Sequence, residues 1–283
     1  MLRNLARRRS LTIAATNSSV AFAAISGLVQ LTLSVYPLQA LKGGPTLASI
    51  ITLSAAWGVL RALPRKSIAR DFTHPPFKIT VKQGDLFDED SHLVIGFTDT
   101  FDTDTNDPEI ISPGSLQAQF LRTRYSGDTA ALDRDIAHAL TGLDIYYMES
   151  RECKPKGKLA RYPVGTVAVL GSPSARYYCV AYSRMERNLI AQSSVDSLWL
   201  SLSHLWDAIS ETGHRERVSI PIIGSDLARI DNLEYESIAK MLILSFAARS
   251  RRSVVSKELT LIVHPRDSAR INMNEVAAFL NSL

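Results

Sequence analysis

The sequence has few cysteines and none of the short motifs that mark the common nucleotide-using enzymes. Its 283 residues include two cysteines, Cys153 and Cys179, which are too few for a disulfide framework and lack metal-ligand spacing. It contains no G-x-x-x-x-G-K-[ST], no G-x-G-x-x-G and no G-x-S-x-G motif. Six scattered histidines form no H-x-x-x-H, and His92 and His264 lie at the edges of predicted strands, where we expect structural roles. We therefore predict neither a metal site nor a catalytic triad.

Acidic residues are absent from the first quarter of the chain. Residues 1–70 hold nine basic residues and no Asp or Glu, whereas residues 71–283 hold 23 basic and 28 acidic residues, a formal charge of −5. The overall charge of +4 therefore comes from the N-terminal quarter. A nucleic-acid-binding domain carries a basic excess on the part that folds, so we expect no nucleic-acid partner. A composition of 46% hydrophobic residues is enough to bury a core.

Two uncharged stretches in that quarter predict a hairpin of two transmembrane helices. The 32 residues between Arg9 and Lys42 carry no formal charge, which is more than the roughly 20 apolar residues that a spanning helix needs. A second, shorter stretch runs from Pro45 to Leu60. We expect residues 1–64 to form this hairpin and to contact the lipid bilayer.

The basic residues orient the predicted hairpin. Four arginines precede the first stretch, four basic residues follow the second, and the turn holds only Lys42. By the positive-inside rule both ends then lie in the cytoplasm. Two alternatives stay open. Residues 8–11, Arg-Arg-Ser-Leu, loosely resemble a twin-arginine export signal with a cleavage site at residues 21–23, and a buried soluble hairpin would need the polar face that these stretches lack.

The rest of the chain reads as a linker followed by one α/β domain. Residues 65–76 are basic and end in His-Pro-Pro, which predicts a linker because proline stops helix and strand alike. Over residues 77–283, the hydrophobic periodicity predicts strands at 77–82, 93–98, 166–170, 177–183, 217–222 and 259–263, and helices at 128–140, 195–209, 233–249 and 274–283. This alternation predicts a mixed sheet flanked by helices, with ligands bound in loops at the carboxyl ends of strands.

Three loops of this domain carry candidate ligand-binding residues. Residues 84–86 follow the first strand and offer a carboxylate that can accept a hydrogen bond from an exocyclic amine. The small residues of 112–116 can expose backbone N–H groups to a phosphate, and residues 224–227 form a strand-to-helix turn that suits an anion. Each loop also fits an ordinary turn or helix start. The candidates are Asp85, Leu86, Ser112, Gly114, Ser115, Leu116, Gly224, Ser225, Asp226 and Leu227.

Taken in order, these loops resemble the macro domain, a fold that binds ADP-ribose and related nucleotides. The resemblance covers residues 77–283. Residues 84–86 fit the family's G-D-[IL], whose Asp contacts the adenine amine, and residues 112–116 correspond to its first phosphate loop. Residues 162–166, Tyr-Pro-Val-Gly-Thr, resemble its C-P-x-G-[ED] turn. Residues 219–226, Ser-Ile-Pro-Ile-Ile-Gly-Ser-Asp, resemble the loop that wraps the diphosphate.

The chain departs from the hydrolytic macro domains after the second strand. Those proteins carry N-A-A-N there, whereas this chain reads Gly-Phe-Thr-Asp-Thr at residues 96–100. By the resemblance, Thr98, Asp99 and Thr100 would face the ribose hydroxyls or a cationic substituent. We therefore expect a binding protein that is not an enzyme and has no cofactor. A membrane-anchored ADP-ribosyl hydrolase is the alternative, and an interaction scaffold without a nucleotide is the third possibility.

With the N-terminal hairpin, the chain is similar to the membrane-linked macro effectors of bacterial Thoeris antiphage systems. That resemblance implies a partner enzyme with a TIR domain, which consumes NAD on infection and releases a diffusible ADP-ribose derivative, in one branch a histidine adduct. It also implies that the derivative binds the macro domain, and that the effector then oligomerises and damages the bacterial inner membrane.

Physical constraints refine this expectation. The ligand is anionic and the domain is net negative, so binding must rest on local N–H groups and a few side chains, with Arg229 as the nearest candidate cation. To switch the membrane segment, the ligand must bind one assembly state of the protein better than another. Moving that equilibrium from 1:99 to 99:1 needs roughly 5.5 kcal/mol of differential affinity. This requirement favours a homo-oligomer, in which several protomers contribute binding energy. We also expect the acidic segment 99–109 to act as a lid over the ligand.

Overall fold

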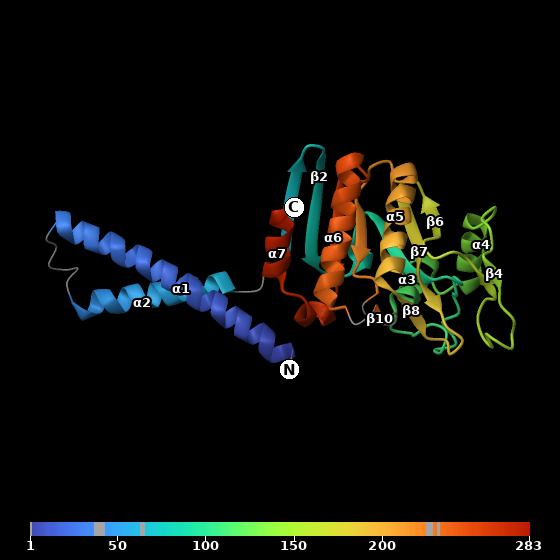
Figure 1. Cartoon of the computed structure of the whole chain (residues 1–283), viewed down its shortest axis with the longest axis horizontal. Helices are drawn as coiled ribbons and strands as arrows, with labels where there is room; N and C mark the ends of the chain where they lie inside the picture. The colour runs from blue at the N-terminus through green and yellow to red at the C-terminus, as the bar shows by residue number, and fades with distance from the viewer. Residues whose placement is uncertain (1, 37–42, 63–65, 225–228, 231–232) are drawn as a thin grey trace. The chain divides into compact units, whose positions relative to one another are not determined.

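The structure is a computed structural model that describes residues 2–36, 43–62, 66–224, 229–230 and 233–283 (Figure 1). The chain separates into two compact units, residues 1–65 and residues 66–283. The predicted hairpin, residues 1–64, falls within the first unit, and the two units are described in turn.

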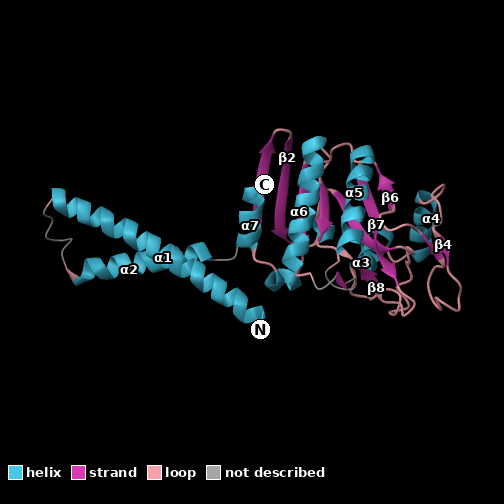
Figure 2. Cartoon of the chain, in the orientation of Figure 1, coloured by secondary structure: helices cyan, strands magenta, loops and turns pink. Residues whose placement is uncertain are grey.

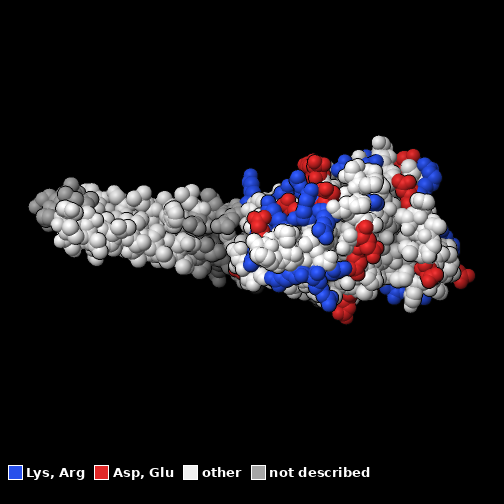
Figure 3. Space-filling view, turned by 90° about the horizontal axis from the view of Figure 1, so that it is seen from above, with Lys and Arg blue, Asp and Glu red and all other residues white. Residues whose placement is uncertain are grey.

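The N-terminal unit consists of two helices that pack against each other. Helix α1 spans Leu2–Val35, and α2 spans Gly44–Ala62. Within α1, residues Ala15–Val35 are long and apolar enough to cross a membrane, judged by length and composition. On the face seen in Figure 3, the described part of this unit displays no charged side chain.

Helix α2 does not meet the same criterion. Among the described helices only α1 does. Because α2 has only 19 residues, every 18-residue stretch of it includes both Pro45 and Arg61, and these two residues lower its mean hydropathy. One candidate span is thus present, and the two-span topology stays a prediction.

The second unit contains a mixed sheet and its flanking helices. Its described strands are β1 Ser67–Thr73, β2 Pro76–Gln83, β3 His92–Thr98, β4 Tyr147–Met148, β5 Ala160–Arg161, β6 Val167–Ser172, β7 Ala175–Met185, β8 Ala191–Ser193, β9 Val218–Pro221, β10 Arg229–Ile230 and β11 Glu258–Val263. Its described helices are α3 Leu116–Tyr125, α4 Thr129–Ala139, α5 Val195–Thr212, α6 Tyr235–Arg252 and α7 Met273–Ser282, with short 3-10 helices η2 Leu86–Asp88 and η3 Pro265–Arg270.

The strand order places the carboxyl ends of five strands at one edge. The described strands pair in the order β1-β2-β11-β9-β3-β7-β8-β10, and β6 also pairs with β7. Strands β2, β11, β9, β3 and β7 are mutually parallel, whereas β1 and β6 are antiparallel to their partners. Strands β4 and β5 form a separate antiparallel pair. The loops that follow the five parallel strands therefore converge at the same edge of the sheet.

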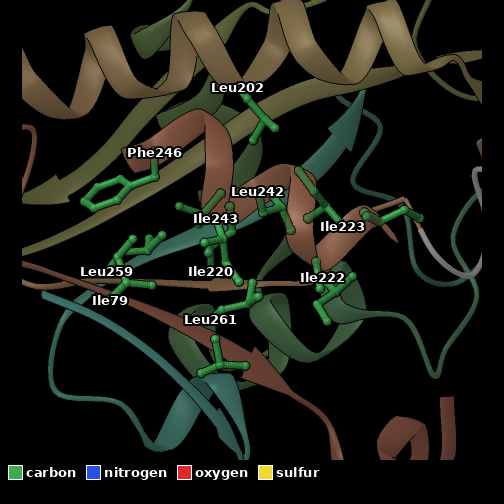
Figure 4. Packing of buried hydrophobic residues seen from close by; sticks show 14 of the residues in the cluster. Ile79, Leu202, Ile220, Ile222, Ile223, Leu242, Ile243, Phe246, Leu259 and Leu261 are labelled. Carbon is green, nitrogen blue, oxygen red and sulfur yellow. The ribbon is translucent and has the colours of Figure 1, made fainter. Parts of the chain in front are cut away.

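Helices cover both faces of the sheet. Helices α5, α6 and α7 pack on one face, where Leu202, Leu242 and Phe246 meet Ile79 and Ile220 of the strands (Figures 2 and 4). Helices α3 and α4 pack on the other face in a second apolar cluster. The consecutive residues 93–95 are buried because a parallel strand with helices on both sides needs apolar residues in both directions. The predicted fold, a mixed sheet flanked by helices in the macro-domain manner, is confirmed.

The predicted linker at residues 65–76 differs from the structure. Residues 67–73 form β1, an edge strand whose register places Ser67 opposite Lys82. Ile68 is buried and Phe72 is stacked on Phe77, with ring centroids 4.3 Å apart. The sequence did not indicate this strand because charged residues lie between its two large apolar residues. Two prolines did not exclude strand because Pro76 occupies the first position of β2, where a missing N–H is tolerated.

Candidate functional site

A cleft of about 370 Å³ lies where the carboxyl ends of the parallel strands converge. Its walls come from the loops after β2, β9 and β11 and from the start of α3, and its floor from β3 and β7. The lining residues are Gly84, Asp85, Leu86, Gly96, Gly114, Ser115, Leu116, Gln117, Gln119, Tyr182, Pro221, Ile222, Ile223, Gly224, Tyr235, Ile262, His264, Arg266 and Asp267.

The first wall is the turn after β2. The N–H of Gly84 donates to the carbonyl of Val263 at 3.1 Å, which ties this turn to the end of β11. Asp85 caps η2, because its Oδ1 accepts from the N–H of Phe87 at 2.9 Å. The cap fixes the carboxylate in the cleft wall, and the half-buried side chain keeps a second oxygen with which to accept a hydrogen bond.

The second wall is the N-terminus of α3. Ser115 caps this ten-residue helix, and its Oγ accepts from the N–H of Ala118 at 3.2 Å. Gly114 precedes the cap, and a Cβ added there would meet no atom within 4 Å. The first N–H groups of a helix lack partners within the helix, so this end of α3 offers N–H groups and a partial positive charge to an anion in the cleft.

The third wall and the floor depend on two glycines. Gly224 has a φ of +87°, and a Cβ there would lie 2.3 Å from Cδ1 of Ile230. Gly96 in β3 lets the ring of Tyr182 lie against the strand, because a Cβ at this position would be 2.5 Å from Cε1 of that ring. A valine at Gly224 would therefore strain the backbone and displace Ile230, besides crowding a ligand.

The fourth wall follows β11, and no motif in the sequence indicated a ligand role for it. His264, Arg266 and Asp267 line the cleft from η3. Nδ1 of His264 accepts from the N–H of Arg266 at 3.3 Å, so this histidine has the expected structural role and also lies in the cleft. The strand before it was predicted, but only the strand order shows that β11 lies beside β2 and β9.

The structure brings together six of the candidate residues. Asp85, Leu86, Gly114, Ser115, Leu116 and Gly224 line the one cleft. Ser112 does not line it, and its carbonyl instead accepts from the N–H of Ser115 at 2.9 Å. Three further candidates, Ser225, Asp226 and Leu227, lie outside the described residues, as does the side chain of Arg229.

The structure places Thr98, Asp99 and Thr100 elsewhere. Asp99 is buried, pairs with Arg161 at 2.7 Å and accepts from the N–H of Met185 at 2.9 Å. The Thr98 and Thr100 hydroxyls bond each other at 3.1 Å, and the latter also donates to Asp102 at 2.5 Å. Asp99 is used inside the domain because Arg161 supplies a buried cationic partner, and the two threonine hydroxyls are used in a hydrogen-bond chain that ends at Asp102. The expectation that these three side chains face a ribose is therefore wrong.

The cationic partners come from the segment that carries β4 and β5. Arg161 bridges Asp99 and Glu149 with its NH1 and Nε atoms at 2.7 and 2.6 Å. Lys154, fully buried, pairs with Asp102 at 2.7 Å. Burial lowers the pKa of Lys154, although the neighbouring Asp102 carboxylate acts in the opposite direction.

The segment 99–109 does not form the expected lid. Its first residues, Phe101–Thr103 among them, are buried. Further along, Asp107 and Glu109 each pair with Lys156 at 2.7 Å. These contacts hold the segment against the β4–β5 region, and none of its residues lines the cleft.

His92 has the structural role that we predicted. Its Nε2 lies 3.2 Å from the carbonyl of Gly213, and its Nδ1 accepts from the N–H of Arg176 at 3.2 Å. Burial lowers the pKa of His92. Within the described residues, no group of three His, Cys, Asp or Glu side chains is arranged to hold a metal ion.

Comparison with known proteins identifies relatives of this domain. Residues 79–264 match the family model described as "Thoeris protein ThsA, Macro domain". The Thoeris protein ThsA of Bacillus amyloliquefaciens (strain Y2) is 24% identical over 208 residues, which cover 71% of this chain and 67% of that protein. Among solved structures, the Oceanobacillus iheyensis macrodomain with ADP covers 77% of this chain and 100% of its own at 8% identity and a TM-score of 0.48. The same macrodomain with MES bound gives 8% identity, 77% and 100% coverage and a TM-score of 0.47.

Proposed function

The chain belongs to the ThsA macro-domain family of Thoeris antiphage defence proteins, and we propose that its macro domain binds an ADP-ribose-derived signal nucleotide in the cleft. The histidine adduct of ADP-ribose is one such nucleotide. A diffusible signal of this kind would come from a partner enzyme with a TIR domain.

The observation that carries the proposal is the meeting of Asp85, the start of α3 and Gly224 in one cavity. An ADP-ribose-like ligand presents an exocyclic amine at one end and a diphosphate in the middle. A fixed carboxylate suits the amine, and helix N–H groups suit the diphosphate. Arg266 adds a candidate cation in the same cleft, which matters because residues 71–283 are net negative.

We propose that the ligand is bound and not hydrolysed, so that the protein acts without catalysis and without a cofactor. Hydrolytic relatives use asparagines where this chain has residues 98–100. Here the side chains of those residues are engaged in hydrogen bonds and an ion pair within the domain. They are therefore unavailable to position a water on a ribose.

The composition of the N-terminal unit supports a role for this protein at the membrane. Its α1 carries the apolar stretch Ala15–Val35, and the basic residues that flank both apolar stretches favour cytoplasmic ends. We propose that the chain is a multi-pass protein of the bacterial inner membrane, with both termini in the cytoplasm. On binding the nucleotide, it forms a homo-oligomer and disrupts the bilayer.

Calorimetry on the full-length protein in detergent micelles tests the binding step. The probes are ADP-ribose and its histidine adduct, and the variant is Asp85→Asn. The amide oxygen keeps the cap on Phe87, but an NH₂ donor replaces the oxygen that would accept from the adenine amine. We expect binding at least about tenfold weaker, which corresponds to about 1.4 kcal/mol.

The matched control is Asp88→Asn, which removes an exposed carboxylate from the same turn. It is expected to bind within about twofold of wild type, since Asp88 does not line the cleft. Equal affinity for wild type and Asp85→Asn would mean that the site is misplaced. Mass spectrometry of the recovered probe decides between binding and the alternative, because a membrane-anchored ADP-ribosyl hydrolase would return cleaved product.

A further inference from the structure

One wall of the cleft lies close to the first residue of the second unit. Because β1 runs antiparallel to β2, its first residue lies beside the last residues of β2. The carbonyl of Lys66 accepts from the N–H of Gln83 at 2.9 Å. The next residue, Gly84, lines the cleft. Lys66 is the first residue of the second unit and follows the N-terminal unit directly in sequence.

A second connection runs from the opposite wall of the cleft to the same strand. The η3 wall ends at Arg270, whose guanidinium lies 4.6 Å from the ring centroid of Tyr235, itself a lining residue. Helix α7 then begins, and the N–H of Asn272 donates to Oε2 of Glu236 at 3.1 Å. At the other end of α7, Arg70 of β1 donates to the carbonyl of Leu280 at 2.5 Å.

Strand β1 is therefore held by two elements that each adjoin a cleft wall in sequence: Gly84 directly follows β2, and η3 precedes α7. It is an edge strand and pairs only with β2 among the described strands. On the face of the sheet that α7 covers, it is held by α7 through Arg70, whose guanidinium also lies 4.8 Å from the ring centroid of Phe72. An edge strand with one pairing partner is among the least protected parts of a sheet.

We propose that β1, held between β2 and α7, transmits occupancy of the cleft to the N-terminal helices. This inference rests on the proposed function, because it needs a ligand that contacts both the turn after β2 and the η3 wall. A ligand that bridges the two walls binds one arrangement of β2 and η3–α7 better than another, and that difference in affinity is what shifts a conformational equilibrium. The contacts of Lys66 and Arg70 carry the shift into β1.

Hydrogen exchange on the full-length protein in detergent micelles, with and without saturating ADP-ribose or its histidine adduct, tests the proposal. We expect the ligand to change the exchange rates of residues 67–73 at least about twofold, although β1 does not line the cleft. Strand β6, residues 167–172, is the internal control, because it is antiparallel to β7 and also lies apart from the cleft lining. Its exchange is expected to stay unchanged.

The variant Arg70→Met removes the donor to Leu280 and keeps an apolar stem beside Phe72. It should bind the probe within about twofold of wild type but lose at least half of the ligand-induced change in β1. The matched control, Arg252→Met, makes the same replacement at an exposed position at the end of α6 and should behave as wild type.

The outcomes separate the two proposals. Calorimetry that detects no binding to wild type defeats the proposed function. Binding that leaves β1 exchange unchanged, or that changes β1 and β6 alike, overturns the transmission role and leaves the binding function standing. If Arg70→Met does not fold, the comparison of β1 with β6 in the wild-type protein still decides the question.

Discussion

At the floor of the cleft, the position of Tyr182 depends on the absence of a side chain at Gly96. The Cβ of an alanine there would overlap Cε1 of the ring at 2.5 Å and crowd Cγ2 of Ile223 at 3.3 Å. We expect Gly96→Ala to displace the ring, to destabilise the protein by about 1–3 kcal/mol as overpacking does, and to weaken nucleotide binding. Urea unfolding followed by tryptophan fluorescence measures the stability.

A double-mutant cycle isolates the cause of that effect. Tyr182→Leu removes the ring atoms that an alanine at position 96 would meet, so Gly96→Ala should cost less than about 1 kcal/mol in the Tyr182→Leu background. Equal costs in the two backgrounds would show that the glycine is needed for another reason.

Single residues were predictable from the sequence where their chemistry is local. Asp85 and Gly224 stand in short strand-to-loop segments, so their type and position indicated a role before the strand order was known. Asp99 was misassigned because its partner, Arg161, lies 62 residues further along the chain. No local pattern shows that a carboxylate after a strand will be neutralised by a distant arginine in the interior.

Among the elements, the β4–β5 hairpin depends most on buried charge. Arg161 of β5 joins Glu149, which follows β4, to Asp99, which follows β3. Replacing the arginine with methionine removes the cation that Asp99 and Glu149 share and leaves Asp99 with the more distant Arg184, at 3.9 Å. Removing one partner of a buried ion pair costs about 3–5 kcal/mol. We expect Arg161→Met to lower the urea midpoint strongly and to speed hydrogen exchange across residues 144–162.

An exposed pair in the same region provides the comparison. Lys156 contacts Asp107 and Glu109 on the surface, where water screens the charges. Lys156→Met should therefore leave the urea midpoint almost unchanged. A midpoint shift as large as that of Arg161→Met would mean that the loop geometry, and not the buried charge, holds the hairpin in place.

The long elements were predictable and the short ones were not. Helix α5 has six buried residues at helical spacing, and β3 is a continuous apolar run, so both patterns are visible in the sequence. Strands β4, β5, β8 and β10 have two or three residues each, too few for any periodicity to develop. Edge strand β1 has polar and charged residues between its apolar ones, as edge strands commonly do.

At the scale of the whole molecule, the chain divides into two units at residues 65–66. The second unit contains every described residue of the cleft lining, and the candidate span lies in the first. We expect a variant lacking residues 1–65 to bind the nucleotide within about twofold of the full-length protein and to lose membrane association. Calorimetry measures the binding, and flotation with vesicles of phosphatidylethanolamine and phosphatidylglycerol at 3:1 measures the association.

Full-length protein is the positive control in the flotation experiment. If the shortened variant floats with the vesicles as well as the full-length protein does, the second unit has its own affinity for lipid and α1 is not the anchor. The charge distribution of the sequence indicated the division into two units, because no acidic residue occurs before Asp71. Whether α2 crosses the bilayer was harder to predict, since its uncharged run is close to the minimum length.

The place of β11 in the sheet has a consequence for the newly made protein. This strand lies between β2 and β9 although it is the last strand in the sequence, and the η3 wall of the cleft follows it. Because the ribosome synthesises the chain from the N-terminus, the apolar helices emerge first, and β11, an interior strand of the sheet, emerges last among the described strands. A nascent chain, or one broken off before residue 258, has the N-terminal helices but lacks β11 and the η3 wall, so its cleft is unfinished. If the cleft binds the signal nucleotide as we propose, such an unfinished chain would not respond to that signal.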